Sequence, residues 1–477
     1  MGQHRKPRIL IVYPSCYYYP DWMERVELKT SQLLLGSFLS RFFDVDYADF
    51  EITIGRPNSP IQIKRFERRV RAYLEKQDFD ILALSCWTSL SYRATLTIAR
   101  ISRELYPDKL IVVGGYHATA LPHEFKTADN RIDYVITGEG ELSLKEIAES
   151  WPAVGRPVET TIVRGPALMS PDFADYDWSL VDDFIKEHFS GKLMNIYLYL
   201  SRGCPFGCSF CMEPLKDRHW RAFPPDKSIE LMFTAAEKYS PMAIAICDAC
   251  FGMRPKWRKD FLRRLAEAKP DYWIVFETRP EYLDEEDIKL LSNLKVEIQF
   301  GLESCSAEML LLMHKTKVPD KFLARFREVS HMLSDNGVLH RANLIFNHPG
   351  ETRKTLEETF AFIDKELERT NSSLMWACHG YMHFPGCELD INREYYEKRF
   401  GSRFLSTRWW HDADDQYASS MRFIPSDDLG EAETGRWEKM LEERRPRMKS
   451  ALTLRAFKFA ATKYFLDWRY DPRYKQS

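Results

Sequence analysis

The sequence predicts an α/β protein: a doubly wound (Rossmann-like) domain, then a full or partial parallel (β/α) barrel, then a mostly helical C-terminal segment. Three observations predict this order. The 477 residues exceed one ordinary domain. Short apolar runs alternate with amphipathic helical stretches twice, in residues 8–145 and again from residue 195. From about residue 387 the alternation stops, and charged helical sequence replaces it.

Composition narrows the class of protein. Hydrophobic residues make up 44% and charged residues 29%, which are values of globular proteins. Lys plus Arg number 68 against 70 Asp plus Glu, so the near-zero net charge argues against nucleic acid or an anionic membrane as a partner. No apolar run of about 18 residues predicts a membrane span, and the first apolar run is too short for a signal peptide. Ten cysteines in a chain of this length are typical of a cytoplasmic protein rather than a disulfide scaffold.

The first alternation predicts a parallel sheet with helices on both faces. Strands are expected at residues 8–14, 44–47, 80–85, 110–114 and 133–137, with helices around 29–43, 63–76 and 92–105. Ligands of such domains lie beyond the carboxyl ends of the strands. We assign this domain to residues 1–150. Residues 151–190 are rich in proline and weakly periodic, so we expect a linker there.

The second alternation predicts six strand–helix units. The expected strands are residues 195–201, 243–247, 273–278, 296–301, 339–346 and 375–384. Six units favour a full or partial parallel barrel over residues 191–390, with its active site at the carboxyl ends of the strands. Residues 391–477 are then the helical C-terminal domain.

The strongest motif is a group of three cysteines directly after the first barrel strand. Cys204, Cys208 and Cys211 follow the spacing CxxxCxxC, and three thiolates so close together can bind one face of a 4Fe–4S cluster. One iron is then left open for a small molecule. Gly203 permits the tight backbone that such a loop needs. A structural zinc site would need a fourth ligand, for which His219 is the nearest candidate.

This motif, with the aromatic Phe210 before its last cysteine, resembles that of the radical S-adenosylmethionine (SAM) enzymes. The resemblance implies a 4Fe–4S cluster bound by the three cysteines, whose open iron binds SAM. It implies reductive cleavage of SAM to a 5′-deoxyadenosyl radical. It also implies a full or partial parallel barrel, in agreement with the alternation.

Further stretches resemble this family in the expected order over about residues 195–390. They are a D-D-x-F-like segment at 248–251, in which Ala249 replaces an acidic residue, E-x-R-P at 277–280, G-x-E-S at 301–304 and a G-x-P-G-E-T-like segment at 347–352, in which Asn347 replaces the first glycine. The resemblance implies that this group binds the cofactors: Phe210, Asp248, Glu277, Arg279, Glu303 and Ser304. Each match alone is weak, but together and in order they are strong.

The N-terminal domain resembles the cobalamin-binding domain often fused ahead of a radical SAM barrel. The segments that carry this resemblance follow three consecutive strands, at residues 85–90, 113–119 and 137–141. Glycines let the backbone approach a bulky ligand, and small hydroxyl groups can bond a nucleotide tail. The implied cofactor-binding residues are Ser85, Thr88, Ser89, Gly114, Gly115, Tyr116, Gly138 and Glu139. The alternative is that these glycines only form the turns of a generic sheet.

The loop after the first strand lacks the D-x-H-x-x-G of many cobalamin domains. We therefore expect no imidazole from this loop on the lower face of the cobalt. The aromatic side chains that could shield that face instead are Tyr17, Tyr18, Tyr19, Trp22 and Trp87.

Our first hypothesis is a cobalamin-dependent radical SAM enzyme that methylates an unactivated carbon of a small-molecule or peptide substrate. Two alternatives stay open: a radical cyclisation or rearrangement in which cobalamin donates no methyl group, and a radical SAM enzyme whose N-terminal domain no longer binds cobalamin. A methylthiotransferase would need three more cluster cysteines in that domain, where only Cys16 and Cys86 occur. An electron donor such as flavodoxin or ferredoxin is implied as a partner.

Several residues remain unassigned by the motifs. Cys247, Cys250 and Cys305 could bind a second metal, although buried thiols are commoner. Trp409 and Trp410 could cover the active site from the C-terminal segment. Residues 444–473 are basic and rich in aromatics, which favours helix packing with snorkelling Lys and Arg side chains.

Overall fold

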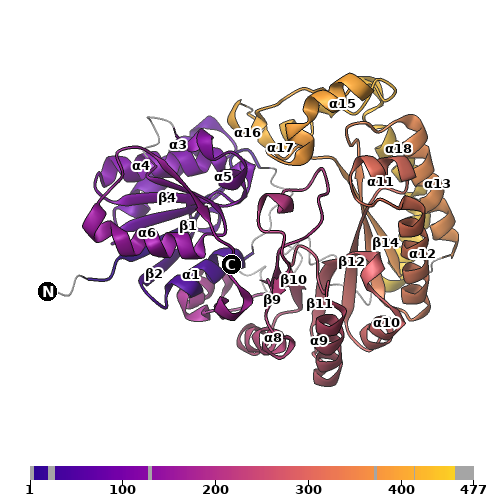
Figure 1. Cartoon of the computed structure of the whole chain (residues 1–477), viewed down its shortest axis with the longest axis horizontal. Helices are drawn as coiled ribbons and strands as arrows, with labels where there is room; N and C mark the ends of the chain where they lie inside the picture. Colours follow the sequence, from indigo (N-terminus) through magenta and orange to yellow (C-terminus); the bar gives the residue numbers. More distant parts are fainter. Residues whose placement is uncertain (1–4, 20–26, 127–131, 370–372, 413, 457–477) are drawn as a thin grey trace.

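A computed structural model of the chain describes residues 5–19, 27–126, 132–369, 373–412 and 414–456. The N-terminal domain and the barrel lie side by side, and helices of the C-terminal segment lie above and between them in the view of Figure 1. In the described residues no helix is both long enough and apolar enough to cross a membrane.

The N-terminal domain contains a six-stranded parallel sheet. Its strands are β1 (Arg8–Tyr13), β2 (Asp44–Asp49), β3 (Ile81–Ser85), β4 (Leu110–Gly114), β5 (Tyr134–Gly138) and β6 (Thr161–Gly165). The strand order is β2-β1-β3-β4-β5-β6, and every pair is parallel. The order reverses direction between β1 and β3, so a ligand is expected beyond the carboxyl ends of these two strands.

Helices cover both faces of this sheet. Ile9 and Ile11 of β1 pack into one core with helices α1 (Thr30–Leu39) and α6 (Glu141–Val154). Leu10 and Val12 pack into the opposite core with α3 (Pro60–Leu74) and α4 (Tyr92–Leu105). Because successive side chains of a strand alternate in direction, a continuous apolar run such as β1 must be buried on both faces. The predicted doubly wound domain is confirmed.

The prediction of a linker at residues 151–190 is wrong. Helix α6 continues to Val154, and β6 pairs with β5 from Tyr134↔Thr161 to Gly138↔Gly165. Helix α7 (Asp182–Phe189) then buries Ile185 and Phe189. The prolines of this stretch concealed these short elements, because strand and helix periodicity cannot be recognised over so few residues between them.

The barrel region contains a second six-stranded parallel sheet. Its strands are β7 (Asn195–Leu198), β10 (Ala243–Ile246), β11 (Trp273–Thr278), β12 (Val296–Glu303), β13 (Leu339–Phe346) and β14 (Leu374–Gly380). The order is β14-β13-β12-β11-β10-β7, so in the described residues β7 and β14 are its edges and the barrel is partial. The covering helices are α8 (Pro225–Tyr239), α9 (Pro255–Ala268), α10 (Glu285–Leu291), α11 (Ala307–Leu312), α12 (Pro319–Asp335) and α13 (Arg353–Arg369).

The C-terminal segment is mostly helical, as predicted. Its helices are α15 (Arg393–Phe400), α16 (Trp409–Asp412), α17 (Gln416–Ser420) and α18 (Arg436–Ala456), with a short antiparallel pair of β15 (Arg403–Phe404) and β16 (Phe423–Ile424). Trp437 of α18 stacks on Phe346 of β13 with ring centroids 5.1 Å apart. This contact attaches α18 to β13, which lies next to the edge strand β14.

Helix α16 joins the barrel to the N-terminal domain. The indole of Trp410 donates to the carboxylate of Glu124 in the N-terminal domain at 2.8 Å. The indole of Trp409 donates to the backbone oxygen of His383, after β14, at 3.1 Å. Both indoles are almost fully buried. The two tryptophans therefore connect the two halves of the molecule, and neither lines the cavity described below.

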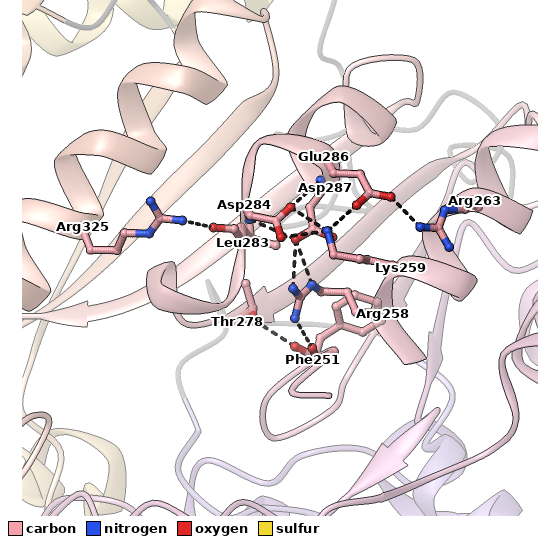
Figure 2. Close-up of polar contacts among 11 residues, drawn as sticks. Phe251, Arg258, Lys259, Arg263, Thr278, Leu283, Asp284, Glu286, Asp287 and Arg325 are labelled. Carbon is pink, nitrogen blue, oxygen red and sulfur yellow. Dashed lines mark hydrogen bonds and ion pairs between the residues drawn. The ribbon is translucent and has the colours of Figure 1, made fainter. Parts of the chain in front are cut away.

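A buried ion pair supports the loop after β10. The Arg258 guanidinium of α9 contacts the Asp287 carboxylate of α10 at 3.0 Å (Figure 2), and the two side chains are 2% and 0% exposed. Arg258 also donates to the backbone oxygen of Gly252 at 2.8 Å. The pair thus connects two outer helices to the loop that carries one of the predicted SAM segments.

Replacing Arg258 by Met should destabilise the barrel, because Asp287 would lose its buried cationic partner. The expected loss is about 3–5 kcal/mol. Arg263→Met is the control, since its ion pair with Glu286 is 53% and 47% exposed and should contribute at most about 1 kcal/mol. Urea unfolding followed by tryptophan fluorescence measures both midpoints. Equal midpoints would contradict the role of the buried pair.

Candidate active site

A cavity of about 650 Å³ lies between the two sheets, at the carboxyl ends of strands from both. On the N-terminal side it is lined by residues of β1, β3, β4 and β5 and of the segments that follow them, and on the barrel side by residues of β7, β10, β11, β12 and β13. Doubly wound sheets and parallel barrels both bind ligands at this end of their strands. The cavity is therefore the candidate active site.

The three cysteines lie in the loop between the short strands β8 (Ser201–Arg202) and β9 (Arg221–Ala222). This loop lines the cavity through Gly203, Glu213, Lys216 and Asp217, whereas the three cysteines are not among the lining residues. Gly203 has φ +84°, and a Cβ there would lie 2.2 Å from the backbone oxygen of His219. Only glycine fits this close approach, so the tight backbone predicted at this position is confirmed. Cys208 is buried, whereas Cys204 and Cys211 are half-buried.

The thiols have a basic neighbour. Burial raises the pKa of all three, whereas the ammonium group of Lys315 lowers it at Cys204 and Cys208. The backbone N–H of Glu213 donates to the sulfur of Cys211 at 3.4 Å. In the described chain, no three His, Cys, Asp or Glu side chains converge as ligands of a single ion. The ligands of a cubane bind separate irons, so their thiols need not converge, and the donor set suits a 4Fe–4S cluster with one open iron.

Asp248 anchors the segment that leads into this loop. One of its oxygens accepts from the backbone N–H groups of Leu200 and Ser201, at 2.8 and 2.9 Å, and the other accepts from the Ser201 hydroxyl at 2.6 Å. Burial raises the pKa of Asp248 to about 6, against these hydrogen bonds. The predicted residue does line the cavity, but protein donors already occupy its carboxylate.

Phe210 and Arg279 pack against protein groups around the cysteine loop, outside the cavity. Phe210 packs against a small core formed by residues of the C-terminal segment and Tyr381. The Arg279 guanidinium lies 3.9 Å from the ring centroid of Phe206 and donates to the backbone oxygen of Lys315 at 2.9 Å. Neither side chain is among those that line the cavity.

The carboxylates of Glu277 and Glu303 and the ammonium group of Lys315 meet around Gly301, near the end of β12. Lys315 lies 3.0 Å from Glu303, and Glu303 adopts a left-handed φ of +69°. Ser304 instead contacts the hydroxyl of Thr359 at 3.2 Å and belongs to the packing behind the strand.

Lys315 carried no motif and was missed by our sequence reasoning. The only signal was a basic residue after the helix that follows the G-x-E-S segment.

Most of the predicted residues of the N-terminal domain also line the cavity. They are Ser85, Gly114, Gly115, Tyr116, Gly138 and Glu139. Thr88 and Ser89 do not line it: the Thr88 hydroxyl accepts from the N–H of Leu90, and the Ser89 hydroxyl contacts the imidazole of His117 at 2.8 Å. The carboxyl edge of the sheet therefore faces the cavity with Gly114, Gly115 and Gly138, which we call the glycine edge, and with Ser85. The hydroxyl groups of Thr88 and Ser89 do not face the cavity.

Beyond this edge the cavity continues as an apolar slot into the N-terminal domain. Its walls come from the sheet and from helices α1 and α6, and they are formed by Ile11, Leu34, Leu35, Ala83, Val112, Ile136 and Leu144. Such a slot beside glycines with an exposed backbone suits a flat aromatic base on a long tail. The residues present therefore fit the nucleotide tail of a cobalamin.

The structure separates the aromatic candidates for the lower cobalt face. Trp87 lines the cavity and is 43% exposed. Tyr17 is buried against Phe66, with ring centroids 5.6 Å apart. Tyr18 and Tyr19 do not line the cavity, and Trp22 lies outside the described residues. Of the four described candidates, Trp87 alone reaches the cavity.

The remaining cysteines are dispersed. All ten cysteines are free thiols. Cys247 lines the cavity, Cys250 is buried near Cys204, and Cys305 belongs to the main hydrophobic core. The positions of Cys250 and Cys305 agree with the commoner role of a buried thiol.

Glu139 forms an ionic contact between the two domains. It accepts from Arg221 at 2.6 Å and lies 3.2 Å from Arg202, and both arginines flank the cysteine loop. Burial opposes its ionisation, but these hydrogen bonds and positive charges together lower the pKa of Glu139. The charged side chain predicted to bind cofactor is thus already paired.

Tyr116 forms a second contact with the cysteine loop. Its hydroxyl donates to the Glu213 carboxylate in a short hydrogen bond. The Lys216 ammonium lies 3.1 Å from the same carboxylate and 4.2 Å from the Tyr116 ring centroid. Because the backbone N–H of Glu213 also donates to the sulfur of Cys211, this contact connects the glycine edge of the N-terminal domain to one of the three cysteines of the motif.

Replacing Tyr116 by Phe should loosen this contact, because Glu213 keeps only Lys216 as its partner. A hydrogen bond to a charged group contributes about 1.5–3 kcal/mol, so cobalamin affinity should fall by about tenfold or more. Hydrogen exchange of residues 211–217 should also become faster. Tyr92→Phe is the control, since that hydroxyl bonds only a backbone oxygen of its own domain, at 3.3 Å. Unchanged exchange in both variants would contradict the role of the contact.

Family comparisons agree with this architecture. Residues 198–363 match the radical SAM superfamily and residues 32–148 match the B12 binding domain. The chain therefore carries a radical SAM domain with a B12-binding domain ahead of it. This combination implies three cofactors: a 4Fe–4S cluster, SAM and cobalamin.

Curated relatives include methyltransferases and a cyclase. An "Uncharacterized methyltransferase PH0819" of Pyrococcus horikoshii is 26% identical over 311 residues, covering 61% of this chain and 65% of the relative. The anaerobic magnesium-protoporphyrin IX monomethyl ester cyclase of Cereibacter sphaeroides is 24% identical, with 59% and 48% covered. The cobalamin-dependent radical SAM methyltransferase TokK of Streptomyces tokunonensis is 23% identical, with 58% and 44% covered. The chain thus matches less than two thirds of the length of each relative.

Two solved structures share the fold. TsrM of Kitasatospora setae, a radical S-adenosylmethionine methyltransferase with cobalamin and a [4Fe–4S] cluster, superposes with a TM-score of 0.60 at 16% identity, covering 94% of this chain and 89% of TsrM. The cobalamin-dependent S-adenosylmethionine radical enzyme OxsB superposes with a TM-score of 0.64 at 16% identity, covering 91% and 66%. At this identity the likeness shows the fold alone.

Proposed function

We propose that this protein is a radical SAM C-methyltransferase that methylates an unactivated carbon of a small-molecule or peptide substrate. The observation that carries the proposal is the single cavity shared by the cysteine loop and the glycine edge of the B12-binding domain. Methylation of a carbon without a lone pair needs a radical source and a methyl source at the same substrate, and one cavity brings both within reach.

The barrel side of the cavity would hold the radical source, and the side of the B12-binding domain would hold the methyl source. Cys204, Cys208 and Cys211 would bind the cluster, with Lys315 and Glu303 beside its open side. Gly114, Gly115 and the apolar slot would hold cobalamin. When bound, the cluster and SAM supply a 5′-deoxyadenosyl radical that abstracts a hydrogen atom, and cobalamin supplies the methyl group. Trp87 would limit access to the cobalt from the N-terminal side.

The residues of the chain would then orient the reactants and exclude water. Glu139 and Tyr116 hold the B12-binding domain against the cysteine loop, and Trp409 and Trp410 hold it from the C-terminal segment. A flavodoxin or ferredoxin would supply the electrons.

A second candidate is a radical cyclisation or rearrangement, which the similarity to the magnesium-protoporphyrin IX ester cyclase favours. The experiment that separates the two uses anaerobically reconstituted protein with the reductant dithionite, SAM and hydroxocobalamin. Methylation would yield S-adenosylhomocysteine together with 5′-deoxyadenosine, whereas cyclisation or rearrangement would yield 5′-deoxyadenosine without it. Absence of bound-cobalamin absorbance would contradict both.

A further inference from the structure

We propose that the groove between helices α3 and α4 of the N-terminal domain is a docking site for an acidic amphipathic helix of a partner protein. In this complex an apolar side chain of the partner packs against Ile61, and its carboxylates face Lys64 and Arg68. The groove has a volume of about 510 Å³ and shares no lining residue with the active-site cavity. The proposal therefore goes beyond the proposed function and does not depend on it.

Helix α3 has two faces of different character, and with α4 it covers one face of the N-terminal sheet (Figure 1). The buried face is formed by Phe66, Val70 and Leu74. The outward face is formed by Ile61, Lys64, Arg65 and Arg68, all of them exposed. Residues at this spacing of three and four lie on the same side of a helix. One apolar and three basic side chains thus form a continuous surface along α3.

The positive charge of this surface is not neutralised within the described chain. Lys64, Arg65 and Arg68 form no ion pair or hydrogen bond with any described residue. Helix α3 carries five basic residues and one glutamate, whereas the whole chain has a net charge of −2. Like charges one helical turn apart repel each other, and carboxylates of a bound partner would relieve this repulsion.

The other cations that line the groove are already paired. The Arg100 guanidinium of α4 lies 2.8 Å from the Glu67 carboxylate of α3 and 2.8 Å from that of Glu104. Arg71 of α3 also contacts Glu104. These pairs join the two helices and so fix the shape of the groove. They leave the cations of the outward face as the ones available to a ligand.

The lining of the groove favours a protein helix over a nucleic acid. Ile61 is 81% exposed at one end, and the buried Ile101 lies at the floor, so the groove offers an apolar contact. Helices that bind in grooves place apolar anchors on one face with charges beside them. No aromatic side chain that could stack on a base lines the groove, and Glu67 opposes a continuous phosphate backbone.

The test uses the full-length reconstituted holoenzyme and three fluorescein-labelled peptides, with binding measured by fluorescence anisotropy. The first peptide is an acidic amphipathic helix of Glu, Ala and Leu, with Leu at every third or fourth position. The second has Ser in place of Leu, and the third has Lys in place of Glu. We expect the first to bind about tenfold more tightly than either of the others, and its affinity to fall as the salt concentration rises.

Two variants of the groove and one matched control locate the site. K64E/R68E should bind the acidic peptide about tenfold more weakly, and Ile61→Ser about fivefold more weakly. K256E/K289E is the control, because it makes the same change in net charge at two exposed lysines of α9 and α10 that form no ion pair within the described chain. It should bind the peptide like the wild type. All of these proteins should have the same urea midpoint, since every substituted side chain is exposed.

Equal binding of the three peptides would overturn the proposal, and so would an unchanged affinity of K64E/R68E or an equal loss in the control. A single-stranded oligouridine that binds more tightly than the acidic peptide would overturn it as well, because the groove would then be a site for phosphates rather than for a protein helix. None of these measurements depends on the cleavage of SAM.

Discussion

Replacing Cys208 by Ala should abolish the cluster and, with it, the cleavage of SAM. Cys208 is the buried member of the three cysteines, and its removal would leave only two thiolates of the motif for the cluster. After anaerobic reconstitution we expect iron and sulfide content to fall to background and 5′-deoxyadenosine to fall below detection. Cobalamin binding should persist, because the glycine edge and the apolar slot belong to the other domain.

Cys305→Ala provides the matched control for this experiment. Cys305 is a buried thiol of the same barrel, 6% exposed, but it belongs to the hydrophobic core. Its variant should keep full iron content and form 5′-deoxyadenosine at the wild-type rate. If the Cys208 variant retained the cluster, or if both variants lost it equally, the assignment of the three cysteines would be wrong.

Replacing Gly115 by Leu should abolish cobalamin binding while SAM cleavage continues. Gly115 has φ +106°, and a Cβ there would lie 2.6 Å from the backbone carbonyl of Cys86 and 2.9 Å from the nitrogen of Trp87. Backbone atoms cannot rotate away as a side chain can, so the loop after β3 must move into the cavity. We expect cobalamin content, read from its absorbance, to fall below one tenth of wild type, a change of about 1.4 kcal/mol or more.

Gly155→Ala separates this effect from backbone strain alone. Gly155 also has a positive φ, of +70°, but a Cβ there would have no atom within 4 Å. Its variant carries the cost of a non-glycine residue in a backbone conformation that favours glycine, about 1–3 kcal/mol, without the clash. It should bind cobalamin like the wild type. Equal loss of cobalamin in both variants would show that general destabilisation, not the glycine edge, is responsible.

The positions of most strands and helices could be predicted from local sequence. The predicted strands at 110–114, 273–278 and 339–346 agree with the structure to the residue. The first two are mainly apolar runs and the third ends on one, and each strand is preceded along the chain by a long amphipathic helix, α4, α9 or α12. Strand β6 was missed because five residues among prolines carry too little periodicity.

The three cysteines that we propose as cluster ligands could be named because their motif lies within one short stretch of sequence. Other candidate residues could be named, but their contacts could not be predicted. Asp248, Arg279 and Ser304 were found by resemblance, yet in the structure they bond protein groups, because a motif specifies a residue type and not its partners. Lys315 was missed because its relation to Glu303 and Cys208 spans a helix and a turn.

The sequence alone determined the two alternating domains, the three cysteines with their spacing, and the resemblance to radical SAM and cobalamin-binding proteins. These features are local, since strand runs, turn glycines and cluster loops each form within a few consecutive residues. Only the tertiary structure decided which residues share the cavity. The alignment of Glu277, Gln299 and Arg341 across β11, β12 and β13 depends on the register of these strands, and the contact of Tyr116 with Glu213 depends on the packing of two domains. Register and domain packing are properties of long-range contacts, which no local stretch of sequence encodes.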